Sequence, residues 1–215
     1  HRELSQALRE KISKKVLGPI LKYSAPLVPN TICWWVVNSS DRYIILFALG
    51  AAYNGIYSMS TKFPTILTMV TSIFYLAWQE TAIKEYNTPE RDRFFSDIFQ
   101  KYYVLLFSLC LCAIPATRIV IELFVSDAFK DAWKYTGFLY LGASFSALCS
   151  FLGMGYQISK ETARSLATTI FAAILNFGVN IACVEFIGLQ AASFSTFAAY
   201  LFLLIIRLRH SKRYF

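Results

Sequence analysis

Two cationic residues, Arg42 and Lys62, interrupt the long apolar runs of this sequence. Charged groups within a membrane span are costly, by roughly 2.5–3.5 kcal/mol on insertion scales, and often mark function. Each lies ten residues from Ala52, the centre of a short polar-poor hairpin. At a rise of about 1.5 Å per residue, both lie about 15 Å from that hairpin, at matching depth. Two cations at one level of neighbouring helices repel each other unless a negative group lies between them.

Two arrangements would relieve this repulsion. The adjacent Asp41 offsets one charge, and an anionic ligand would offset the other, since arginine favours phosphate and carboxylate groups. The alternative is a structural network of Asp41, Arg42 and Lys62 whose long side chains extend toward the interface. The residues alone favour neither arrangement.

Polar stripes accompany these charges. The longest has steps of three and four residues, which place its members on one face of a helix: Ser58, Thr61, Thr65, Thr68, Ser72, Tyr75 and Gln79. Shorter stripes comprise Ser24, Thr31 and Asn38, and Thr162, Ser165, Thr169, Asn176 and Asn180. Hydroxyls that bond back to their own helix are the alternative, but three stripes together favour a lined cavity. Pro64 predicts a kink within the longest stripe.

The elements that carry these stripes are six apolar runs. The chain has 215 residues, 56% of them hydrophobic and only 16% charged, against about 25% charged in soluble domains, and its mean hydropathy is +0.47. The runs are long enough to cross a bilayer, at about 23–46, 54–81, 102–124, 132–156, 161–185 and 188–208. We therefore predict an all-α integral membrane protein with a six-transmembrane-helix bundle over 23–208.

The connections set the orientation. Those on one side of the predicted bundle hold sixteen Lys and Arg residues, and those on the other side hold three. This bias places both termini in the cytoplasm, with 1–22 as a basic connector and 209–215 as a tail. It also accounts for the net charge of +8 without a nucleic acid, whose binders carry a basic stripe on a folded surface.

The remaining patterns concern packing. Small residues between Ala143 and Gly155 predict close helix packing by the fourth span, whereas the third and sixth spans lack polar faces and are predicted to face lipid. The segments 1–22 and 90–99 are amphipathic. They fit either short helices on the inner leaflet or connectors that pack beneath the bundle, and we favour connectors.

The sequence contains no motif that indicates an enzyme. The two histidines are His1 and His210, and the five cysteines lie inside apolar runs without a metal-binding spacing. No nucleophile motif or glycine-rich phosphate loop is present. We predict neither catalysis nor a metal or other cofactor.

Several runs resemble a known family. They are YSAPLVP at 23–29, WWVVNSSDRY at 34–43, NGIYSMSTKFP at 54–64 and AWQ at 77–79. Together they resemble the middle of bacterial polysaccharide-repeat (O-antigen type) flippases, which belong to the multidrug/oligosaccharidyl-lipid/polysaccharide exporter superfamily. The resemblance is dense over 23–86 and only compositional beyond. Because the chain begins with His1 rather than Met, we expect it to be the interior of a longer reading frame.

The resemblance implies a transporter of two helical bundles around a central cavity, of which this chain is the C-terminal half and lacks its N-terminal bundle. Such flippases move an undecaprenyl-pyrophosphate-linked oligosaccharide across the bacterial inner membrane by alternating access, without ATP hydrolysis. Arg42 and Lys62 match cationic positions of the family. The expected substrate-binding residues are Arg42, Lys62, Asp41, Asn38, Ser58, Thr65 and Gln79.

Two alternatives stay open. A drug or small-cation exporter of the same superfamily would use an intramembrane carboxylate, and only Asp41 lies well inside a predicted span. A non-transporting membrane assembly subunit would pack its three stripes against each other and leave no cavity.

Overall fold

The computed structural model describes residues 14–211, and within this range it is helical, with no strand. After the short α2 (Lys14–Ser24), each predicted span overlaps one long helix. These helices are α3 (Leu27–Ala48), α4 (Ala51–Glu85), α5 (Arg91–Phe124), α6 (Trp133–Ile158), α7 (Thr162–Ile187) and α8 (Gln190–Ser211), with the short η1 (Asp127–Ala132) before α6. The part of the predicted connector at 1–13 lies outside the described residues.

Within residues 14–211, four helical segments are long and apolar enough to cross a membrane: Arg91–Phe124, Asp127–Ile158, Thr162–Ile187 and Gln190–Ser211. They overlap the last four predicted spans. The first two helices, α3 and α4, have lower hydropathy because α3 contains Asn38, Asp41 and Arg42 and α4 carries the long hydroxyl stripe. A crossing by α3 and α4 therefore stays a prediction.

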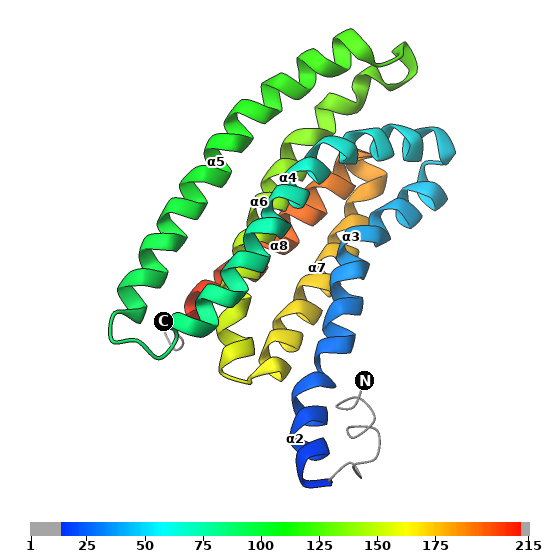
Figure 1. Ribbon diagram of the computed structural model, residues 1–215. Helices are drawn as coiled ribbons and strands as arrows, with labels where there is room; N and C mark the ends of the chain where they lie inside the picture. The colour runs from blue at the N-terminus through cyan, green and yellow to red at the C-terminus, as the bar shows by residue number, and fades with distance from the viewer. Residues whose placement is uncertain (1–13, 212–215) are drawn as a thin grey trace, which may run out of the picture.

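The helices form one bundle in which α6 and α8 pack along each other, α7 packs against α8 and α3, and α4 packs on α6. Figure 1 shows α5 along the outer edge, where it mainly contacts α6. The start of α3 and the end of α8 lie at the same end of the bundle, and α4 is continuous through Pro64 but visibly bent. This bend agrees with the kink expected at a proline within a helix.

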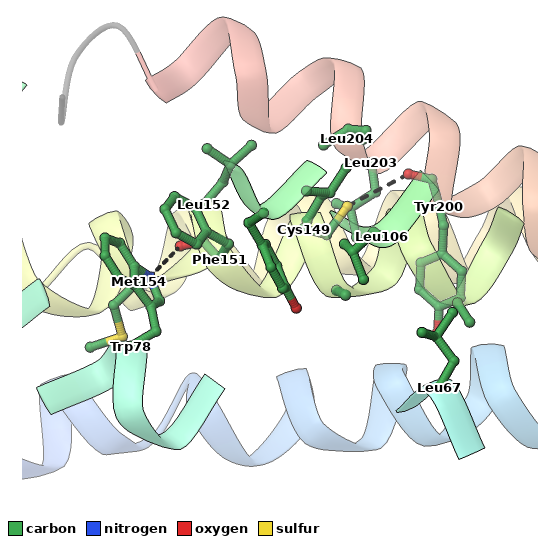
Figure 2. Packing of buried hydrophobic residues seen from close by; sticks show 14 of the residues in the cluster. Leu67, Trp78, Leu106, Cys149, Phe151, Leu152, Met154, Tyr200, Leu203 and Leu204 are labelled. Atoms are coloured by element: carbon green, nitrogen blue, oxygen red, sulfur yellow. Dashed lines mark hydrogen bonds between the residues drawn. The ribbon is translucent and has the colours of Figure 1, made fainter. Parts of the chain in front are cut away.

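The core lies mainly on α6. The rings of Trp78 and Phe151 stack with their centroids 4.0 Å apart, and the Trp78 indole donates a hydrogen bond of 3.3 Å to the Phe151 carbonyl (Figure 2). The predicted packing face of the fourth span is confirmed, since Ala143, Ala147 and Gly153 are buried. At Gly142, an added Cβ would meet Thr196 at 3.4 Å.

The prediction that the sixth span faces lipid was wrong. Its helix, α8, buries ten residues against α6, α7 and α3: Ala191, Ala192, Ser193, Ser195, Thr196, Ala199, Tyr200, Leu203, Leu204 and Arg207. The small residues let neighbouring backbones approach closely. The segment 90–99 packs against the core, as the favoured alternative expected, but it does so as the start of α5 and not as a separate connector. Its Phe95 is buried edge-on against Trp78, with centroids 4.8 Å apart.

Candidate functional site: a buried carboxylate beside a polar cavity

Asp41 lies at the junction of four helices and is 2% exposed. Its carboxylate accepts hydrogen bonds from the Tyr57 hydroxyl at 2.9 Å, the Asn180 amide at 2.7 Å and the Thr196 hydroxyl at 2.6 Å. These donors come from α4, α7 and α8, while Asp41 itself is on α3. One carboxylate therefore joins four helices that are distant in the sequence.

A second set of hydrogen bonds surrounds this carboxylate. The Ser40 hydroxyl donates to the side-chain oxygen Oδ1 of Asn176 at 3.1 Å. The side-chain amide of Asn176 in turn donates to the hydroxyls of Ser195 at 3.4 Å and Thr196 at 3.3 Å. Asn176 and Asn180 are fully buried. The predicted cavity lining by the fifth-span stripe was therefore wrong: its members are used in contacts between α7 and its neighbours.

The long stripe on α4 does line a cavity, of about 390 Å³, between α3, α4, α6 and α8. Its polar lining includes Asn38, Asp41, Arg42, Thr61, Thr65 and Thr196. A second cavity of about 200 Å³ shares Thr68, Ala143 and Ser146 with the first and continues toward Trp78. The two cavities together follow the polar face of α4 along α6.

The predicted site residues separate into two groups. Asn38, Asp41, Arg42 and Thr65 line the larger cavity, where the exposed Arg42 guanidinium donates a hydrogen bond of 3.3 Å to the Thr61 hydroxyl. The Tyr200 hydroxyl donates to the side-chain oxygen Oδ1 of Asn38 at 2.9 Å.

The other three predicted residues, Lys62, Ser58 and Gln79, line neither of these cavities. Lys62 is exposed on α4, and Ser58 uses its backbone carbonyl to accept the Thr61 hydroxyl. Nor does a network of Asp41, Arg42 and Lys62 form among the described residues, because the Asp41 partners are Tyr57, Asn180 and Thr196. Adjacent helical residues point about 100° apart, so Asp41 and Arg42 face different neighbours.

Sequence reasoning missed Tyr57, Thr196, Tyr200 and Arg207. Arg207 was counted among the cytoplasmic basic residues, yet it is 2% exposed. The available signal was spacing, since Thr196, Tyr200 and Arg207 recur at helical intervals on one face of α8.

The arrangement offers two kinds of chemistry. The guanidinium of Arg42 lines the polar cavity, where it can bind an anion. The Asp41 carboxylate, in contrast, is surrounded by uncharged hydrogen-bond donors and holds four helices together. Across the described residues, no cluster of three or more His, Cys, Asp or Glu side chains that could hold a metal ion is found.

No known protein family, curated protein or solved structure matches this chain.

Proposed function

We propose that this chain is a six-span half of a bacterial inner-membrane flippase that translocates an undecaprenyl-pyrophosphate-linked oligosaccharide by alternating access. The observation that carries the proposal is the cavity along the polar face of α4, with Arg42 in its lining. Its lining includes three residues of each of the two runs on which the family resemblance mainly depends: Asn38, Asp41 and Arg42 from 34–43, and Tyr57, Thr61 and Pro64 from 54–64. The N-terminal bundle of the same protein would supply the facing wall.

The contacts of the two charged groups favour an anionic substrate. The Asp41 carboxylate already accepts three hydrogen bonds of 2.6 to 2.9 Å. Arg42, in contrast, is exposed and makes one longer hydrogen bond, of 3.3 Å to Thr61. A guanidinium in this position can exchange that bond for a pyrophosphate oxygen, which is a stronger, charge-assisted partner.

One observation favours the alternative of a drug or small-cation exporter: the Asp41 carboxylate also lines the cavity. An exporter of cations would use this carboxylate as its binding group. The assembly-subunit alternative is less favoured, because it predicts that the α4 stripe packs without leaving a cavity.

The test is Arg42→Ala in the full-length protein, in a host strain that lacks its own flippase. We expect loss of surface polysaccharide, because removing a charge-assisted contact worth about 1.5–3 kcal/mol weakens binding by about 10- to 150-fold. Arg42→Lys should retain part of the activity. Lys101→Ala, an exposed cation on α5, is the matched control and should leave polysaccharide unchanged.

Immunoblotting of membranes controls for protein amount. Normal polysaccharide in cells with Arg42→Ala would refute the anion site. If Asp41→Asn abolishes drug resistance conferred by the protein while Arg42→Ala has no effect, the cation exporter replaces the flippase.

A further inference from the structure

The side chain of Arg207 is a buried cation at one end of the bundle. Its guanidinium donates to the Cys149 carbonyl on α6 at 2.6 Å, and to the Ser165 and Thr169 hydroxyls on α7 at 3.4 and 3.2 Å. Because Arg207 itself is near the end of α8, one side chain joins three helices. We call this end, which holds the connection from α6 to α7 and the end of α8, the inner end.

Two aromatic rings complete the surroundings of Arg207. The guanidinium carbon lies 5.8 Å from the centroid of the Trp34 ring and 5.7 Å from that of Tyr156. Distances of this kind give a cation–π attraction. Trp34 belongs to α3, so Arg207 contacts all three of the helices that pack around α8.

No carboxylate of the described residues lies within ion-pair distance of this guanidinium. Its Nε atom is buried and makes no hydrogen bond to any residue that the structure describes. Of the three hydrogen bonds that the guanidinium makes, the one to Ser165, at 3.4 Å, is longer than the usual N–H···O range, and the one to Thr169, at 3.2 Å, is at the upper end of that range. Burial removes the cation from water without a counter-charge, so release of Arg207 would recover hydration that its present partners replace only in part.

The cluster at Asp41 differs from this arrangement. There the carboxylate accepts three hydrogen bonds of 2.6 to 2.9 Å. The helices are thus joined by short hydrogen bonds at Asp41 and by mostly longer ones at Arg207, and each cluster contains one buried polar atom without a hydrogen-bond partner among the described residues, Oδ1 of Asn180 and Nε of Arg207.

We propose that Arg207 is a releasable interhelical clamp: its guanidinium holds the inner ends of α6, α7 and α8 together, and its release opens the bundle at that end. The Asp41 cluster keeps α3, α4, α7 and α8 joined when the clamp opens. Packed interfaces of this kind have discrete closed and open arrangements rather than a continuous range.

Gly153 gives the clamp a steric requirement. A Cβ added at this position would lie 2.6 Å from Nη1 of Arg207, the atom that donates to the Cys149 carbonyl. An alanine would therefore displace the guanidinium while leaving its charge and all other side chains in place. At Gly178 on α7, by contrast, an added Cβ meets nothing within 4 Å.

Cys149 is a reporter of clamp opening because it is fully buried and its thiol donates to the Tyr200 carbonyl at 3.6 Å (Figure 2). The experiment uses the full-length protein with every other cysteine replaced, and measures the rate of N-ethylmaleimide modification in membranes. We expect Gly153→Ala and Arg207→Lys to raise this rate several-fold, since lysine lacks the fork that reaches two helices. The controls, Gly178→Ala and Arg209→Lys, should label at the parental rate.

A double substitution separates the clamp from general loosening. Adding Gly153→Ala to Arg207→Ala should give no further increase, because the atom that the new Cβ displaces is already gone. An additive increase would overturn the proposal, and so would parental labelling in both Gly153→Ala and Arg207→Lys. Gel filtration verifies that each variant is folded, and if Arg207→Lys does not accumulate, Gly153→Ala decides alone. The assay needs no transport substrate, so its outcome is independent of the proposed flippase activity.

Discussion

Substitution of Tyr57 by phenylalanine tests whether the Asp41 cluster stabilises the bundle. Tyr57 is 3% exposed, and its hydroxyl donates to the Asp41 carboxylate at 2.9 Å. The change removes one of three donors and leaves the ring in place. A hydrogen bond to a charged group contributes about 1.5–3 kcal/mol. At about 2–4 °C per kcal/mol for a chain of this size, we expect Tm to fall by about 3–12 °C.

The assay is thermal unfolding of the purified full-length protein in detergent, with Tyr43→Phe as control. Tyr43 is 56% exposed, so its change should alter the free energy of unfolding by less than about 0.5 kcal/mol. Tyr57→Phe is then repeated in an Asp41→Asn background. Bonds between neutral groups contribute about 0.5–1.5 kcal/mol, so the loss should be about half as large. Equal losses in the two backgrounds would refute the proposed role of the carboxylate.

Two further predictions concern the core and the crossings. Trp78→Ala should lower the free energy of unfolding by about 3–5 kcal/mol, because the 3% exposed ring stacks on Phe151; a loss below about 1 kcal/mol in chemical denaturation would contradict this. In a cysteine-free protein, Ala52→Cys and Ser126→Cys should react with an impermeant maleimide from outside the cell, and Glu90→Cys only after the membrane is opened. Reaction of Ala52→Cys and Glu90→Cys from the same side would exclude a crossing by α4.

The approximate positions of the long helices were predictable because long apolar runs separated by polar connections indicate them. Their ends were less so, since α5 begins at Arg91, well before the predicted span at 102–124. The cavity face of α4 was predictable for a similar reason, since helical periodicity alone places Thr61, Thr65 and Thr68 together. Periodicity describes one helix at a time, however. It could not show that Asn176 and Asn180 would meet α3 and α8 rather than a cavity, because the partner helix is chosen by tertiary packing.

The charged residues show the same limit. Counting from the hairpin gave Arg42 and Lys62 a common depth, but depth does not fix the direction around the helix axis. Lys62 follows Thr61 by one residue and so points about 100° away from it, and it does not line the cavity. Arg207 ends an apolar run, where arginines commonly extend toward the interface. Only its neighbours on other helices, such as Gly153, show why it is buried instead.

The low hydropathy of α3 and α4 does not argue against a crossing, because most of the polar side chains that lower it, although several of them are exposed, line the cavity or make hydrogen bonds within the helices. Asp41 is buried, and the hydroxyls of Thr65 and Thr68 bond to carbonyls of their own helix. The surfaces of both helices that stay exposed carry large apolar side chains: Ile32, Trp35, Phe47, Ile66, Met69, Val70, Ile73 and Leu76. Contact with lipid depends on the polarity of this outer surface and not on the mean hydropathy of the whole helix. An apolar surface of this extent would promote aggregation in water, which favours its being covered by lipid or by other protein.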